Sequence, residues 1–163
     1  MIGFNKRKRH DDHNALRFCG HRPVPSVSAP AYAGWETTRW GMSPKEAIAV
    51  LDGAVEHAPA SNEIYEQAGK KYAPLVKLSR EIEGVPGQVS LLFDTDETLR
   101  FVMFNPADVA ACDALGAALA ERYGAADAVG AGAISISDWV DGAEVIKLTK
   151  VGSSVCNLSY SAN

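Results

Sequence analysis

The sequence is poor in the features by which catalytic and membrane-spanning proteins are most easily identified. It has three cysteines and four histidines in 163 residues, and it lacks an uninterrupted apolar run of about 18 residues, the length of a membrane-spanning helix. The G-x-S-x-G turn of serine hydrolases is absent, and the glycine-containing segment AVGAGAIS (residues 128–135) lacks the lysine of a phosphate-binding loop. No motif therefore indicates a hydrolase or a nucleotide-binding protein, and we predict no cofactor.

Enough apolar sequence is present for one globular domain. Apolar residues make up 47% of the chain, and a chain of this length buries about two-thirds of its unfolded surface. Charge is uneven: residues 1–33 carry six basic and two acidic side chains, whereas the remainder carries ten basic and eighteen acidic ones. Because an acidic body repels phosphate backbones, we expect no nucleic-acid partner.

The basic N-terminal segment has two of the three parts of a secretion signal. NKRKR is a positive n-region, and Ala31-Tyr32-Ala33 is a small-x-small cleavage triplet, but the apolar middle region is missing. We infer that the natural precursor is exported and that a frameshift or a wrong start codon upstream of about residue 28 has replaced its apolar segment. The chain as written lacks a working signal region, so we predict a disordered leader at 1–33 and a single domain at 34–163.

Two other interpretations of this segment are weaker. KRKR is short and lacks interleaved aromatic residues, so it is a poor nucleic-acid or nuclear-targeting signal. Metal-binding residue types also occur here, but their spacing matches no usual Cys/His pattern, so we predict no metal site. These residues are His10, His13, Cys19 and His21.

The domain is predicted to begin with a short strand and a capped helix. Residues 35–40 alternate bulky and polar side chains, which is typical of a strand. Ser43 can cap a helix that starts at Pro44, and Glu46 completes a capping box. The helix should run over 44–52 and stop at Gly53.

An irregular segment and three strands follow. Residues 54–74 are predicted to form a surface loop or a short helical turn from Asn62 to Glu66, and they contain His57, the only histidine outside the N-terminal segment. Alternation predicts strands over 76–83, 89–93 and 99–104. The acidic turn DTDET between the last two lacks the glycine and the twelfth-position glutamate of a calcium loop. We therefore interpret it as an exposed turn.

The second helix has the clearest signals. Asn105 is the expected cap, Pro106 the first helical residue and Gly124 the stop. The apolar stripe that should pack across a sheet contains Val109, Cys112, Leu115, Leu119 and Tyr123.

The last third again reads as strands. Ile134 and Ile136 alternate with serines, Asp141-Gly142 marks a tight turn, and residues 145–149 and 156–160 form further strands. The fold class is therefore α+β: an antiparallel sheet of about six or seven strands with both helices on one face. The element order also suggests two pseudo-repeated halves, each a helix and three strands.

Three segments together resemble a recurrent group of proteins. WGMSPKEA (residues 40–47) just after a cleavage site, the hairpin LLFDTDETLRFVMF (residues 91–104) and the helix ending in RYG are similar to small exported bacterial proteins of unknown function that open with a Trp-Gly-Met-Ser/Thr motif. The resemblance extends loosely over 34–163. It implies a periplasmic or secreted location for the natural precursor, and it brings no catalytic residues.

Two cysteines lie in the predicted domain. Cys112 is on the inward stripe of the second helix, and Cys156 is on the inward face of the last strand. Both can be small buried apolar residues. If the domain is exported, they can instead form a disulfide across 43 intervening residues, worth about 3–4 kcal/mol of stability. The sequence leaves both alternatives open.

Two functional classes remain. The first is a non-catalytic exported domain that binds a protein, a peptide or an envelope component through its sheet face or through an aromatic edge formed by Trp35, Trp40 and Trp139. The same tryptophans can equally be half-buried core residues.

The second class is a small hydrolase or transferase with an acidic site. The candidate residues are Glu81, Glu83, Asp94, Asp138 and His57. A cleft that gathers several of these carboxylates beside His57 would favour the enzyme, whereas a shallow exposed aromatic patch would favour binding.

Overall fold

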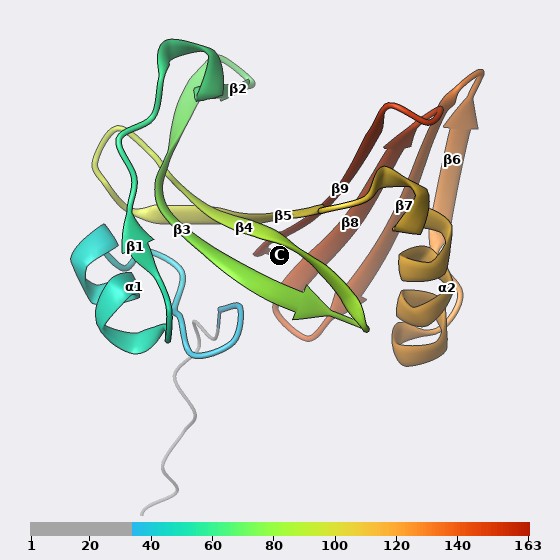
Figure 1. Cartoon of the computed structure of the whole chain (residues 1–163), viewed down its shortest axis with the longest axis horizontal. Helices are drawn as coiled ribbons and strands as arrows, with labels where there is room; N and C mark the ends of the chain where they lie inside the picture. The colour runs from blue at the N-terminus through green and yellow to red at the C-terminus, as the bar shows by residue number, and fades with distance from the viewer. Residues whose placement is uncertain (1–33) are drawn as a thin grey trace, which may run out of the picture.

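The computed structural model describes residues 34–163 (Figure 1). The predicted leader at 1–33, and with it His10, His13, Cys19 and His21, lies outside the described residues. None of the helices in the described part of the chain is long and apolar enough to span a membrane.

The described residues form nine antiparallel strands, two α-helices and two 3-10 turns. Their order along the chain is α1 (Pro44–Val50), β1 (Val55–Glu56), η1 (Ser61–Glu63), β2 (Tyr65–Gln67), β3 (Lys70–Ile82), β4 (Val85–Phe93), β5 (Leu99–Pro106), η2 (Val109–Ala111), α2 (Cys112–Tyr123), β6 (Asp127–Ala131), β7 (Ile134–Asp141), β8 (Glu144–Val151) and β9 (Val155–Ala162). Across the sheet the strand order is β1-β3-β4-β5-β9-β8-β7-β6, and β2 pairs with β3 alone.

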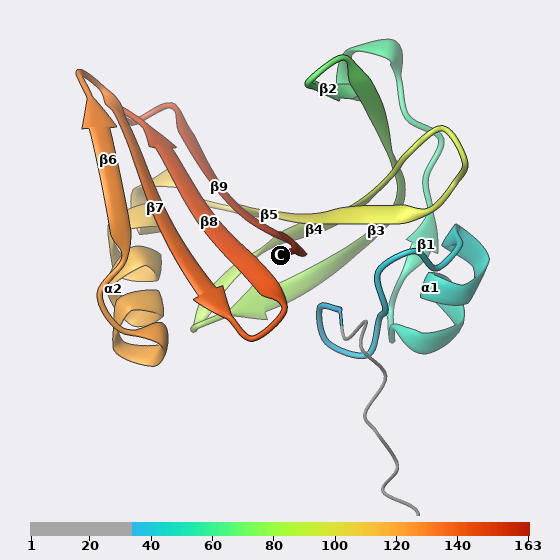
Figure 2. The same ribbon diagram turned by 180° about the vertical axis from the view of Figure 1, so that it is seen from behind.

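The sheet is strongly bent. Figures 1 and 2 show β3 and β4 on one side and β6–β9 on the other, with β5 crossing between them. We call these two sides the first and the second wing. The β2 hairpin rises from the far end of the first wing, and the helices lie on the opposite side of the sheet from it.

One face of this sheet carries the core. A row of facing residues crosses the sheet from β3 to β7, and all of its members belong to the core cluster: Val76, Leu91, Val102, Tyr160, Ile146 and Trp139. Ala47 and Leu51 from the α1 region and Cys112, Leu115 and Leu119 from α2 are buried in the same cluster. The helices therefore both cover this one face, as the sequence predicts.

Local sequence signals explain the helix start and the tight turns. Ser43 and Glu46 form the predicted capping box: the Ser43 hydroxyl accepts from the Glu46 amide, and the Glu46 carboxylate accepts from the Ser43 amide. Gly132 and Gly142 each take a positive φ at the first position of a two-residue turn, a conformation that glycine adopts without strain.

The sheet is larger than predicted, and the pseudo-repeat is not seen. Residues 34–163 contain nine strands rather than six or seven, and five of these follow α1 whereas four follow α2. The loop or helical turn expected over 54–74 contains instead β1, a single 3-10 turn and β2, because Ala68-Gly69 makes a tight turn that folds β2 back onto β3.

Two further local predictions are wrong. Residues 35–40 form turns rather than a strand, because the Thr38 amide and hydroxyl both donate to the Trp35 carbonyl. Asn105 does not cap the second helix: β5 continues to Pro106, which pairs with Gly87. The chain then enters η2, where the Asp108 carboxylate accepts from the Ala110 amide.

Candidate functional site

The face of the sheet opposite the core is largely uncovered, and we call it the open face. Side chains alternate between the two faces of a strand, so the residues next to core positions point to this side. One row of pairs crosses the whole sheet here, and most of its members are polar: Lys77, Ser90, Met103, Ser159, Lys147, Asp138 and Asp127. The Lys147 ammonium lies 3.7 Å from the Asp138 carboxylate.

The second wing adds apolar side chains to the open face. In the register of β6 to β9 they occupy two neighbouring rows, and we call them the apolar patch: Val129, Ala131, Ile134, Ile136, Val151 and Val155. Val129 is 65% exposed, Ile134 45% and Val155 39%. Contiguous exposed apolar side chains on a folded domain indicate an interaction surface.

An aromatic cluster occupies the other end of the open face. Tyr72 of β3 packs edge-on against Phe101 of β5 with the ring centroids 4.9 Å apart, and Tyr65 of β2 lies 6.4 Å from Tyr72 and 6.5 Å from Phe101. Leu92 pairs with Phe101 across β4 and β5 and is buried. Tyr72 and Leu92 stand outside the core cluster, so the β2 hairpin builds a second, smaller apolar layer.

Two hollows lie beside this cluster, and both are bordered by Tyr65 and Met103. One, of about 310 Å³, lies over the first wing and includes Glu63, Lys77 and Gln88. The other, of about 230 Å³, lies between the β2 hairpin and the second wing and includes polar side chains of β8 and β9, namely Lys147, Thr149, Asn157, Ser159 and Ser161. The open face is therefore concave, with aromatic, apolar and hydroxyl side chains.

A charged group stands at the rim of the open face. Glu63 accepts from the Lys77 ammonium at 2.5 Å, from the Ala60 amide at 2.9 Å and lies 3.0 Å from His57 Nε2. These contacts, with Lys77 the largest, lower the pKa of Glu63 to about 2. Glu63 is thus a fixed negative charge that neutralises Lys77, the only lysine of the first wing in the polar row.

The candidate acidic residues for catalysis are dispersed. His57 lines a hollow of about 450 Å³ beside α1 with Glu56 and Glu97, and none of the four predicted carboxylates is there. Asp94 closes its own turn, where it accepts from Thr98 and Arg100.

Glu81 and Glu83 share a different hollow, at the end of the core face. It measures about 310 Å³ and is also lined by Tyr160 and Glu144. Glu83 is paired with Arg122, and burial followed by the nearby Asp141 raises the pKa of Glu144. Asp138 lies on the open face. The five candidate catalytic residues are therefore not gathered in one cleft. In the described residues no group of three or more His, Cys, Asp or Glu side chains is arranged to hold a metal ion.

The tryptophans do not form an aromatic edge. Trp35 and Trp139 are buried in the core cluster, and Trp40 packs against it. Trp35 lies 6.3 Å from the Tyr160 ring, and Trp139 Nε1 donates to the Gly124 carbonyl at 2.9 Å. Their positions agree with the alternative that they are core residues.

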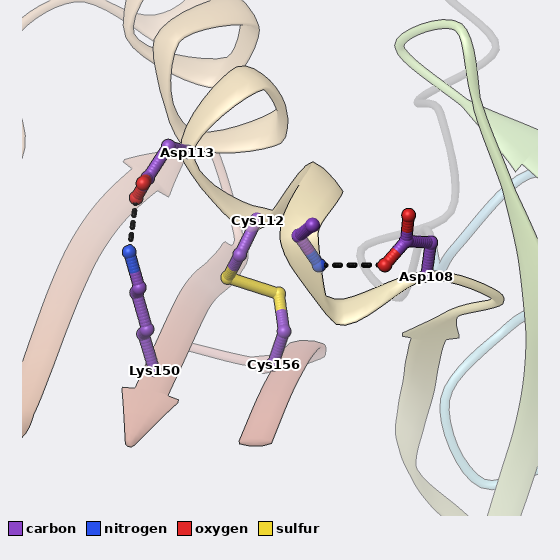
Figure 3. The surroundings of a disulfide bond; sticks show 6 residues. Asp108, Cys112, Asp113, Lys150 and Cys156 are labelled. Atoms are coloured by element: carbon purple, nitrogen blue, oxygen red, sulfur yellow. Dashed lines mark hydrogen bonds and ion pairs between the residues drawn. A yellow bond between two sulfur atoms is a disulfide. The ribbon is translucent and has the colours of Figure 1, made fainter. Parts of the chain in front are cut away.

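Cys112 and Cys156 are bonded to each other. Figure 3 shows the bridge between the first residue of α2 and the beginning of β9, with the Lys150–Asp113 ion pair beside it. The two Cα atoms are 5.8 Å apart, a usual separation for a disulfide. The bridge holds α2 against the core face of the second wing. The other side of that wing belongs to the open face.

Sequence reasoning did not find the open-face residues. The signal was available in β7, where Ile134, Ile136 and Val140 alternate to one face while Trp139 belongs to the other. A strand with apolar residues on both faces is either covered on both sides or exposed on one.

Comparison with known proteins gives little beyond this geometry. No protein-family model matches the chain, and no curated protein matches it. Among solved structures, the DUF4309 family protein YjgB from Bacillus subtilis aligns with a TM-score of 0.43 and 9% sequence identity, over 74% of this chain and 78% of that one.

Proposed function

We propose that residues 34–163 form a non-catalytic domain that binds a protein partner on the open face. The observation that carries the proposal is the exposure of the apolar patch on a sheet whose other face already has a complete core. Full burial of a Val or Ile side chain is worth about 1.5–3 kcal/mol, so the exposed parts of these side chains leave a share of that stabilisation for contact with a partner.

The chemistry of the face fits a protein better than a nucleic acid. Its apolar patch and its aromatic cluster are separated by hydroxyl and amide side chains, and such a mixture of apolar and neutral polar groups is usual in protein interfaces. The two lysines in its polar row, Lys77 and Lys147, lie beside carboxylates of Glu63 and Asp138. No positive stripe is therefore left for a phosphate backbone.

We further propose that the natural precursor is exported to the bacterial envelope, where the partner would be an envelope protein. The Cys112–Cys156 bridge supports this location, because disulfides persist in oxidising compartments. The cleavage-type triplet at residues 31–33 and the resemblance to small exported proteins agree with it.

Site-specific photo-crosslinking tests the surface. A photoreactive amino acid replaces Ile134 on the open face, and the matched control carries it at Val50 of α1; the two side chains are 45% and 43% exposed. In envelope extract we expect position 134 to form a discrete adduct with one protein, identified by mass spectrometry, and position 50 to form none.

Binding by that identified protein is then measured with purified components. Ile134→Asp should weaken it by about ten-fold or more, because burial of a charge in an apolar contact is costly, and Val50→Asp should leave it unchanged. Equal adducts at both positions, or equal binding by both variants, would contradict the proposal.

A further inference from the structure

The two edges of the sheet are protected very differently. At the β1 edge the outer strand has only two residues, and the next strand, β3, has Pro74 and a register shift between Pro74 and Val76. Short edge strands, prolines and bulges all prevent pairing with another chain. The β6 edge has none of these: its five residues pair with β7 in unbroken register, and all five are exposed.

The hairpin geometry determines which main-chain groups β6 presents outward. Ala131 and Ile134 flank the two-residue turn Gly132-Ala133 and pair with each other. Residues that flank such a turn form a hydrogen-bonded pair, and alternate residues along the strand repeat this pattern. Asp127, Val129 and Ala131 therefore direct their main-chain groups to β7. The amides and carbonyls of Ala128 and Gly130 point away from it.

We propose that β6 of one molecule pairs antiparallel with β6 of a second copy about a two-fold axis at Val129, which joins two sheets into one. In this register Ala128 faces Gly130 of the other copy on each side of the axis. Both pairs can exchange two hydrogen bonds, so about four main-chain bonds form.

The side chains of β6 are compatible with this self-pairing. Asp127, the only charged residue of the strand, comes opposite Ala131 and not opposite its own copy. The two Val129 side chains meet at the axis on the open face, next to Ile136 of each copy. Pairing thus covers Val129, which is 65% exposed in the single molecule. The contact is closed because the same strand serves both molecules.

This inference is independent of the proposed partner on the open face. Its main-chain contacts lie at the sheet edge, and of the apolar patch it uses Val129 at the axis. A dimer would present two open faces on the same side of one continuous sheet. Failure of the photo-crosslinking experiment would leave it intact, and a monomeric protein would leave the proposed function intact.

Sedimentation equilibrium of the full chain over a range of concentrations is the test. We expect a monomer–dimer equilibrium that Val129→Lys weakens by at least about ten-fold, because two like charges then face each other across the axis. Val140→Lys is the matched control: Val140 is 62% exposed, against 65% for Val129, and lies on β7 beyond the residues that pair with β6. It should dimerise as the unmodified chain does.

Two further variants separate main-chain pairing from any other contact. Gly130→Pro removes an outward amide without touching the β7 ladder, and we expect it to be monomeric with an unchanged circular dichroism spectrum. In a Cys19→Ser background, Val129→Cys should form a disulfide-linked dimer on mild oxidation, whereas Val140→Cys should not. A chain that is monomeric at every concentration, or a dimer insensitive to Val129→Lys, would overturn the inference.

Discussion

At the scale of single residues, Gly87 shows how tightly the sheet is packed. A Cβ atom added to Gly87 would lie 2.4 Å from the Asn105 carbonyl oxygen and 2.5 Å from the Phe104 ring. Neither the carbonyl of β5 nor a fully buried ring can move aside freely. We expect Gly87→Ala to lower the free energy of unfolding by about 1–3 kcal/mol, as overpacking does, measured by urea denaturation.

Gly130→Ala is the control for this measurement. Gly130 also lies within a strand, but its added Cβ would meet only the Ile134 carbonyl oxygen, at 3.4 Å. The free energy of unfolding should therefore change by less than about 0.5 kcal/mol. Equal effects of the two variants would mean that the loss of glycine itself, and not the contact with Phe104, sets the cost.

At the scale of elements, the disulfide fastens α2 to β9. The bridge closes a loop of 43 intervening residues. It lowers the entropy of the unfolded chain and thereby stabilises the folded protein by about 3–4 kcal/mol. Replacing both Cys112 and Cys156 with alanine should lower the free energy of unfolding by about this amount, measured by chemical denaturation. Because α1, the β3–β4 hairpin and α2 share one core cluster, they should unfold together in a single transition.

Thiol titration checks the bond directly. The sequence has three cysteines, so denatured protein without reductant should react at one thiol, and reduced protein at three. Three reactive thiols before reduction would exclude the bridge, and with it the structural support for export.

Elements also show what sequence patterns can and cannot predict. The capping box of Ser43 and Glu46, the apolar alternation from Val76 onward and the helix stop at Gly124 were readable because each depends on neighbours a few residues away. The alternation at 35–40 wrongly predicted a strand. Trp35 is buried by a turn at Glu36, whose φ is 51°, so the burial of this side chain does not require a strand. Whether Cys112 reaches Cys156 depends on how α2 packs on the sheet, and no local sequence pattern predicts this packing.

At the scale of the whole molecule, the sequence alone does not locate the candidate site, because tertiary packing decides which face of a strand is covered. Periodicity identifies two faces of β7 but does not say which is covered. That is decided by α2, which is fastened to the Trp139 side by the disulfide and leaves Ile134 and Ile136 open. The aromatic cluster likewise exists only because Ala68-Gly69 turns β2 back over β3.

The stability of the whole molecule should depend on pH, and Asp94 and Glu144 are two carboxylates that should affect it in opposite directions. Burial tends to raise the pKa of Asp94, but hydrogen bonds from the Thr98 amide, Arg100 and the Thr98 hydroxyl outweigh it and bring the pKa to about 2. A lowered pKa gives stability that is present above the unfolded value, near 4, and is lost as the pH falls toward 2. Burial raises the pKa of Glu144, so its ionisation opposes folding at neutral pH.

Unfolding measured from pH 2 to 7 should therefore separate two variants. Asp94→Asn should cost about 1–2 kcal/mol at pH 7, less than the full shift because Arg100 is half exposed. The cost should shrink as the pH approaches 2, where Asp94 of the unmodified chain is itself protonated. Glu144→Gln should do the reverse: it stabilises the protein at pH 7, where Oε1 of the carboxylate is buried without a partner, and has little effect below pH 4. If the two profiles ran parallel, these carboxylates would not be the source of the pH dependence.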